Sequence, residues 1–169
     1  MSERPSDVSD EMRELYGKPG HLIRRAHQLA TALFAEECGE LTPVQYAALW
    51  AIAAQPGIDA TRVSALIAFD RSTIGDVLER LEGKGWIRRE TSPADRRVKL
   101  LYVTEEGSTV LRTVASAVER VQARLLQPLS PDERSVLIRV LARLVGLEEA
   151  VEAPRRAAAT AGAGRLRRA

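Results

Sequence analysis

Residues 59–103 decide the fold of this chain, and they read DATRVSALIAFDRSTIGDVLERLEGKGWIRRETSPADRRVKLLYV. The first half spaces its apolar side chains by three and four residues, which is typical of amphipathic helices. A short helix capped by Asp59 is followed by a break at residues 68–70. Asp70 or Ser72 can cap the next helix, whose apolar positions are Ile74, Val77, Leu78 and Leu81.

The period of the pattern changes after Gly85. Residues 86–90 and 98–103 are rich in β-branched and aromatic side chains, and they predict two strands. Pro93 and Asp95 lie between these strands and favour a turn, which gives a hairpin with a charged tip. A short helix, a break, an amphipathic helix and such a hairpin, in this order, indicate a winged helix-turn-helix.

Longer amphipathic helices are predicted on both sides of this segment by the same spacing and by capping signals. They cover about residues 21–38, 43–54, 105–127 and 131–145. We therefore expect a mainly α-helical protein with a small β-hairpin wing. We expect a flexible arm over 1–19. The chain after Glu149 carries no apolar stripe, so we expect a disordered, Arg-rich tail over 151–169.

The composition excludes several classes of protein. Hydrophobic residues make up 45% and charged residues 28% of the 169 residues, which suits one soluble globular domain. The chain has no apolar run of membrane-spanning length and no signal peptide, so we expect a cytoplasmic protein. Cys38 is the only cysteine, which excludes an internal disulfide and a thiolate zinc cluster. Without a nucleophile motif, a phosphate loop or a metal-ligand cluster, we predict no enzymatic activity, no cofactor and no metal.

Positive charge gathers in the middle of the chain. Residues 59–99 carry 9 basic and 7 acidic side chains, whereas residues 1–58 carry 5 and 8 and residues 100–150 carry 6 and 7. In and around the hairpin, six cations oppose only Glu90 and Asp95, and these cations are Lys84, Arg88, Arg89, Arg96, Arg97 and Lys99. Such a patch suits the phosphates or the minor groove of DNA, although a solvated charged surface is the alternative.

Five stretches resemble the MarR family of bacterial transcription regulators: LTPVQY (41–46), DRSTIG (70–75), LEGKGWIRR (81–89), DRR (95–97) and LYVTEEG (101–107). The resemblance covers about residues 20–147. It implies a homodimer with two winged modules on a pseudo-palindromic DNA operator, and repression that a small ligand relieves. Within the family, residues 42–49 and 58–75 are similar to regulators of aromatic-acid breakdown, the hydroxycinnamate and nicotinate repressors.

The resemblance also divides the chain and assigns DNA contacts. It implies a MarR-type domain over 20–150, with the winged helix-turn-helix at 41–103 and dimerisation helices at 20–40 and 104–150. The first turn of the recognition helix would enter the major groove, and the wing arginines would reach the minor groove or the backbone, while Asp95 pairs with a nearby arginine. We predict DNA contacts from Arg71, Ser72, Thr73, Asp76, Arg80, Arg88, Arg96, Arg97 and Lys99.

A ligand site is suggested by two groups of side chains. At 100° per residue, one face of the first long helix carries cations, a histidine and an amide, and the next helix pairs two aromatic rings at i, i+4. Guanidinium groups suit a carboxylate and aromatic rings suit a ring, so a small aromatic acid fits this set. The predicted ligand residues are His21, Arg24, Arg25, Gln28, Tyr46 and Trp50. The alternative is that the arginines are solvated or ion-paired and that the two rings belong to the core.

The sequence therefore predicts a dimeric DNA-binding repressor that a small aromatic carboxylate, or its coenzyme A thioester, releases from its operator. Metal sensing is disfavoured because His21 and His27, six residues apart, point in different directions on a helix. Two alternatives stay open: a ligand-independent or activating regulator, and a winged-helix module that binds proteins. The basic hairpin argues against the second, because a module that binds only proteins does not need it.

Overall fold

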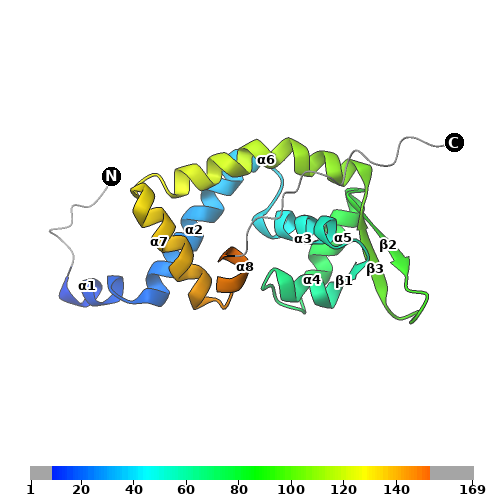
Figure 1. The fold of residues 1–169 in the computed structure, drawn as a ribbon, viewed down its shortest axis with the longest axis horizontal. Coiled ribbons are helices and arrows are strands. Elements are labelled where there is room, and N and C mark those ends of the chain that lie inside the picture. Colours follow the sequence, from blue (N-terminus) through cyan, green and yellow to red (C-terminus); the bar gives the residue numbers. More distant parts are fainter. Residues whose placement is uncertain (1–8, 153–169) are drawn as a thin grey trace. The chain divides into compact units, whose positions relative to one another are not determined.

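The computed structural model describes residues 9–152, and the chain divides into two compact units, the first ending at Leu125 and the second beginning at Leu126 (Figure 1). The second unit contains helices α7 (Pro131–Leu144) and α8 (Glu148–Glu152). The first unit contains α1 (Asp10–Tyr16), α2 (Pro19–Cys38), α3 (Pro43–Ala54), β1 (Ile58–Asp59), α4 (Ala60–Leu66), α5 (Ile74–Gly83), β2 (Ile87–Thr91), β3 (Lys99–Val103) and α6 (Glu105–Leu125). The prediction of a mainly helical chain with a β-hairpin is confirmed.

The sheet has one strand more than the sequence predicts. Its order is β1-β3-β2, and both pairings are antiparallel, with Ile58 opposite Leu101 and Ile87 opposite Val103. Strand β1 has two residues, which is too short for an alternating pattern to reveal. Its pairing ties the segment before α4 to the base of the hairpin.

Most helix starts follow the predicted caps, but α5 does not. Thr42 and Gln45 form the predicted capping box at α3, with Oγ1 of Thr42 accepting from the Gln45 amide at 3.3 Å. Helix α5 begins at Ile74 without a side-chain cap, so the prediction of Asp70 or Ser72 as its cap is wrong. The Asp70 carboxylate accepts instead from the Ser72 amide at 2.7 Å, which closes a turn ahead of the helix.

The predicted flexible arm contains a helix. Ser9 accepts a hydrogen bond from the Met12 amide at 3.4 Å and caps α1, a capping signal that the sequence analysis missed. At the other end, Val151 and Glu152 belong to α8. Residues 1–8 and the remainder of the predicted disordered tail, 153–169, lie outside the described residues.

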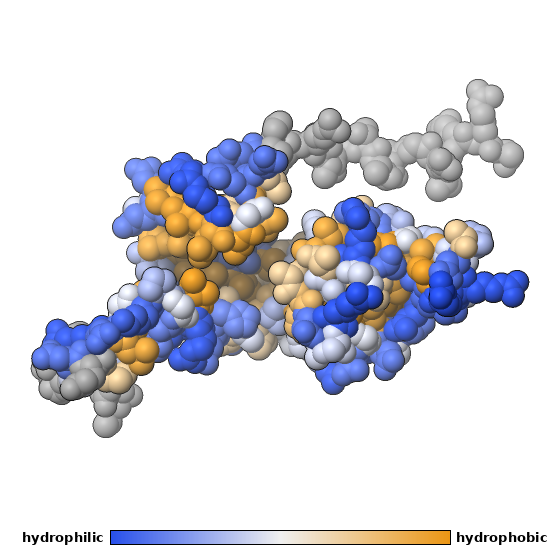
Figure 2. Space-filling view, turned by 90° about the horizontal axis from the view of Figure 1, so that it is seen from below, coloured by the Kyte–Doolittle hydropathy of each residue, from blue (hydrophilic) through white to orange (hydrophobic). Residues whose placement is uncertain are grey.

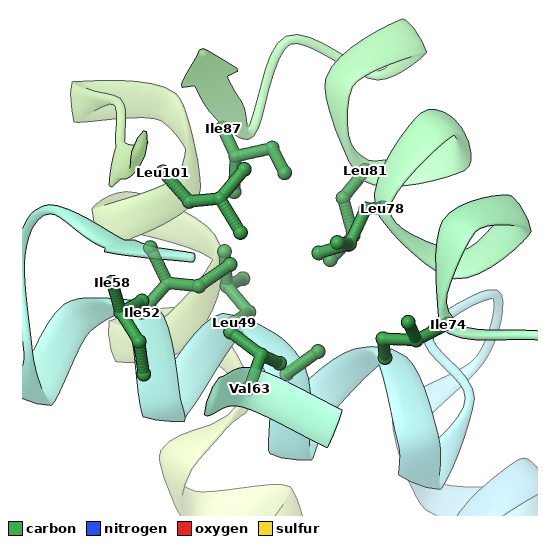
Figure 3. Close-up of a cluster of buried hydrophobic side chains, with 10 residues drawn as sticks. Leu49, Ile52, Ile58, Val63, Ile74, Leu78, Leu81, Ile87 and Leu101 are labelled. Carbon is green, nitrogen blue, oxygen red and sulfur yellow. The ribbon is translucent and has the colours of Figure 1, made fainter. Parts of the chain in front are cut away.

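A core of aliphatic side chains fixes α5 against α3, α4 and the sheet (Figure 3). Its largest fully buried members are Leu49, Ile52, Val63, Leu78, Leu81 and Leu101. The apolar spacing in the sequence predicts Leu78 and Leu81 on one face of α5, and burial of that face turns the opposite face outward. The core therefore decides which side of α5 is available to a partner.

A second cluster joins α2 to α6 through Leu33, Phe34, Leu41 and Val121. Next to it, the Glu37 carboxylate accepts hydrogen bonds from Arg120 at 2.8 Å and Arg124 at 3.0 Å. Arg124 also pairs with Glu36 at 2.8 Å. Hydrogen bonds from Arg120 and then Arg124 lower the pKa of Glu37 below its ordinary value of 4.5.

The lowered pKa predicts acid sensitivity of the α2–α6 contact. Because Glu37 releases its proton more readily in the folded state, its contribution is complete above about pH 4.5 and is lost as the pH falls through the lowered pKa. Glu37→Gln is therefore expected to reduce stability at pH 7 and to reduce the loss of stability on acidification. Urea unfolding at pH 7 and pH 3.5 measures both. Equal pH dependence in the two proteins would contradict the assignment.

Candidate nucleic-acid interface

The turn that leads into α5 exposes Arg71, Ser72 and Thr73. The Ser72 hydroxyl and amide both donate to the Asp70 carboxylate, and they lower its pKa below the ordinary 3.8, so Asp70 keeps its charge. Thr73 Oγ1 donates to the Asp70 carbonyl at 3.2 Å. Both hydroxyl protons are thus used within the turn, whereas Arg71 has no hydrogen-bond or ion-pair partner among residues 9–152. Its guanidinium is the free donor of this turn.

The hairpin holds its cations in different ways. Arg97 donates to both oxygens of Asp95, at 3.2 and 3.1 Å, as the resemblance implies for that aspartate. These bonds lower the pKa of Asp95. Arg96 is exposed and has no such partner within the described part of the chain. At the hairpin tip, the Arg97 guanidinium is therefore held by Asp95, whereas the Arg96 guanidinium is free to bind a partner.

Two further cations lie along the strands. The Arg88 guanidinium lies over the Tyr102 ring, 4.5 Å from its centroid, and pairs with Glu90. Lys99 donates to Thr91 Oγ1 across the hairpin at 2.8 Å. Side chains at the hairpin end of the first unit are hydrophilic, as the blue surface at the right of Figure 2 shows.

Lys84 and Arg89 do not belong to the basic patch that the sequence indicates. Lys84 lies over the Trp86 ring at 4.5 Å, and the Arg89 Nε atom is 3.0 Å from a carboxylate oxygen of Glu82. The alternation of side chains along β2 explains the position of Arg89, because the neighbouring residues Arg88 and Arg89 point to opposite faces of the sheet. A count of charges along the sequence does not take this alternation into account, and it therefore does not identify Glu82 as the carboxylate that opposes Arg89.

Asp76 and Arg80, also predicted DNA contacts, are exposed on α5. With Thr73 they border a hollow of about 290 Å³ that the start of α3 lines on its other side. Arg80 has no ion-pair partner among the described residues. The structure thus places all nine predicted DNA contacts on α5, the turn before it, and the hairpin.

The predicted ligand residues fall into two separate groups. At the start of α2, the His21 ring contacts the Tyr16 ring, with centroids 5.6 Å apart, and the Arg25 guanidinium lies 5.8 Å from the centroid of Tyr16. The other group is Tyr46, which touches Phe34 at 5.8 Å and Trp50 at 6.0 Å between centroids. Neither Tyr16 nor Phe34 was among the predicted ligand residues.

An open groove of about 440 Å³ accompanies the second group. Tyr46 and Trp50 line it together with Ala47, Ala51, Ala54, Gln55, Leu66 and Ile67. Trp50 is 57% exposed, which argues against an ordinary core position for this ring. Burial raises the pKa of the Tyr46 hydroxyl, so it stays neutral. The groove suits an aromatic ring but has no cation among its lining residues.

The comparisons with known proteins agree with this geometry. The profile of the MarR family matches residues 41–99, which hold the helix-turn-helix and most of the hairpin. The PcaV transcriptional regulator from Streptomyces coelicolor, in complex with its natural ligand, is 34% identical over 86% of this chain and 98% of that one, with a TM-score of 0.74. This chain belongs to the MarR family. MarR-family proteins are transcriptional regulators and not enzymes.

Two further solved structures show what related MarR-type regulators bind. The transcriptional repressor CouR, bound to a 23-mer DNA duplex, is 30% identical, covers 82% of this chain and 99% of its own, and has a TM-score of 0.75. The DNA binding of BpsR from Bordetella bronchiseptica is regulated by 6-hydroxynicotinic acid. BpsR is 28% identical over 76% of this chain and 94% of its own, with a TM-score of 0.72. The resemblance to the aromatic-acid branch of the MarR family is confirmed.

Across residues 9–152, no helix has the length and apolarity that a membrane span requires. The same residues contain no group of three or more His, Cys, Asp or Glu side chains placed to hold a metal ion.

Proposed function

We propose that this MarR-family protein is a homodimeric, sequence-specific repressor that a small aromatic carboxylate, or its coenzyme A thioester, releases from a pseudo-palindromic operator. The observation that carries the DNA-binding part is the exposed turn before α5. Its free donor, Arg71, lies beside a helix whose apolar face is locked into the core. A rigid helix with an unpaired arginine at its start can make bidentate contacts with guanine in the major groove.

The wing supplies the second part of the proposed DNA contact. Arg96 is free to enter a minor groove or meet a phosphate, while Asp95 holds Arg97 in a fixed direction. Arg88 and Lys99 would contact phosphates, which position the protein without reading sequence. Cations that replace condensed counterions make such binding strongly salt-dependent.

Exposed apolar side chains support the proposed homodimer. Leu22 and Leu29 on α2 are each 51% exposed, and Leu144 and Val145 at the end of α7 are each 63% exposed. Hydrophobic residues gather on the second unit, as the orange surface over α7 and α8 in Figure 2 shows. Apolar surface of this extent is typical of a protein interface. A symmetric dimer also matches an operator with two half-sites.

The proposed effector site has two parts, the cations at the start of α2 and the groove at Tyr46 and Trp50, and one chain does not bring these parts together. Arg25 and Phe34 are nine residues apart on α2, which is about 13 Å along a helix axis. The cations thus lie well away from Tyr46 and its groove. In the proposed dimer, α2 of one copy would bring its cations to the groove of the other. A ligand that joins both copies in this way needs to favour the released state by only a few kcal/mol.

Arg24→Ala is expected to abolish release by the aromatic acid while operator affinity without the acid stays within about twofold. The reason is that Arg24 provides charge for the carboxylate but lies outside the proposed DNA contacts. Fluorescence anisotropy with a labelled operator, titrated with 6-hydroxynicotinate, benzoate and related acids, measures both quantities. Arg112→Ala is the matched control, because it removes the same charge from α6. An unchanged acid response in Arg24→Ala would contradict the proposed site.

The alternatives predict different results in the same experiment. A ligand-independent regulator, or an activator, would bind the operator selectively but would not leave it when any acid is added. A winged-helix module for protein interaction would bind DNA without sequence preference.

A further inference from the structure

Tyr16, on the helix that the sequence did not predict, is the aromatic neighbour of the proposed carboxylate-binding residues. Its ring contacts His21 on one side of the α1–α2 turn and lies under Arg25. The turn itself is short and well bonded. Gly17 and Lys18 donate to the carbonyls of Arg13 and Leu15, and Lys18 forms a 2.8 Å ion pair with Glu14. Helix α1 therefore holds the Tyr16 ring in a defined place.

The polar groups around Tyr16 are short of partners. The Nε2 atom of His21 is buried without a hydrogen bond, although the residue as a whole is only partly buried. Arg24 and Arg25 form no ion pair with any carboxylate among residues 9–152. A buried imidazole nitrogen without a partner is costly, and the exposed Arg24 and Arg25 guanidinium groups keep their donors available to a ligand. A carboxylate would satisfy both, since it accepts from a protonated nitrogen and from guanidinium groups.

We propose that Tyr16 is a specificity-determining residue of the effector site: its ring packs against the aromatic ring of the bound acid and steadies Arg25, while His21 and Arg24 take the carboxylate. This inference rests on the proposed function and adds α1 to the site. Tyr16 is 37% exposed, so part of its ring is open to a ligand. Aromatic rings prefer to pack against one another in offset or edge-to-face arrangements, which a saturated ring cannot reproduce.

The test compares benzoate with cyclohexanecarboxylate, which has the same charge and a similar size but no aromatic ring. Calorimetric titration of the full-length protein is expected to give tighter binding of benzoate. Tyr16→Leu is expected to weaken benzoate binding about five- to tenfold and to remove the preference, because an aliphatic side chain fills the space without a π face. Tyr16→Phe is expected to keep both the affinity and the preference within about twofold, since the ring is retained.

Leu15→Ala is the control on the same helix, because it removes an exposed apolar side chain next to Tyr16 and leaves the ring in place. Thermal unfolding shows whether each variant folds. The contact in the free protein has its own readout: the Tyr16 ring shifts the NMR signals of the His21 imidazole, and Tyr16→Leu removes that shift. With two histidines in the chain, a His27→Gln variant assigns the signals.

The outcomes separate this proposal from the proposed function. The role of Tyr16 is supported if Tyr16→Leu loses the preference for benzoate over cyclohexanecarboxylate and Tyr16→Phe keeps this preference. If acids bind and release the operator but Tyr16→Leu keeps the preference, the role of Tyr16 is overturned and the repressor function stands. If wild type binds neither benzoate nor cyclohexanecarboxylate while other aromatic acids release the operator, Tyr16 does not select for a plain aromatic ring, and this proposal is overturned. If no aromatic acid binds the protein or releases it from the operator, both the role of Tyr16 and the proposed release by an aromatic acid are overturned.

Discussion

Arg71→Ala is expected to lower operator affinity roughly 5- to 150-fold, because one lost bidentate contact with a guanine costs about 1–3 kcal/mol. Arg71 is the group before α5 whose donors are not used within the protein, since Ser72 and Thr73 donate to Asp70. Competition against duplexes changed at one base pair at a time is expected to show that the variant has lost its preference at one position in each half-site. Anisotropy titrations at a fixed salt concentration measure the affinity.

The control for Arg71 is Arg139→Ala, which removes an equal charge from the exposed side of α7. It is expected to bind the operator like wild type. Arg96→Ala, at the free hairpin tip, is expected to lower affinity more evenly across sequences and to flatten the salt dependence if it meets a phosphate. Wild-type affinity in both Arg71→Ala and Arg96→Ala would rule out the proposed DNA-binding surface.

Gly107→Ala is expected to destabilise the first unit by about 3 kcal/mol or more, the upper range for overpacking at a site that cannot yield. A Cβ atom at this position would lie 2.1 Å from the Trp86 backbone oxygen and 2.9 Å from a methyl group of Val103. The Trp86 oxygen cannot move freely, because it accepts from the Thr104 amide at 3.0 Å. Either α6 or the base of the hairpin has to shift, so DNA binding is expected to fall together with stability.

Gly75→Ala is the matched control for Gly107→Ala. Gly75 lies in the first turn of α5, and no atom lies within 4 Å of a Cβ built there. Alanine in an open helix position is expected to stabilise by about 0.5–1 kcal/mol. Urea unfolding of both variants measures the difference. Equal stability of the two would show that the contact between Gly107 and Trp86 is not as tight as the structure has it.

The helices that carry the fold were predictable because their apolar residues repeat over several turns. Leu78 and Leu81 lie in the core as their spacing predicts, and Thr42 forms the capping box that its neighbours predict. The short elements were not predictable by the same means. Strand β1 has two residues and α8 has five, so no period develops within them. Tertiary pairing, not local pattern, places β1.

The sequence predicts which candidate residues share a helix face but not how the two groups of candidates are arranged in the fold. Spacing on one helix groups His21 with Arg25, and the structure keeps them together around Tyr16. Spacing cannot show how far Tyr46 is from that group, because the distance depends on where α3 meets α2. The sequence does offer one signal for the contact between Tyr16 and His21. Pro19 favours a helix start, so a turn between Tyr16 and Pro19 can place the Tyr16 ring near His21. Charge counting failed at Arg89, which faces Glu82.

The central claim is that α5 and the wing read an operator from which an aromatic acid releases the protein. The most direct test is to sequence the genomic DNA fragments from its own organism that the full-length protein retains, at a stated salt concentration. The test is run with and without a panel of aromatic acids and their coenzyme A thioesters. We predict that fragments sharing one pseudo-palindromic sequence are retained and that one compound removes them. Retention without any common sequence, or a common sequence that no compound releases, would contradict the account.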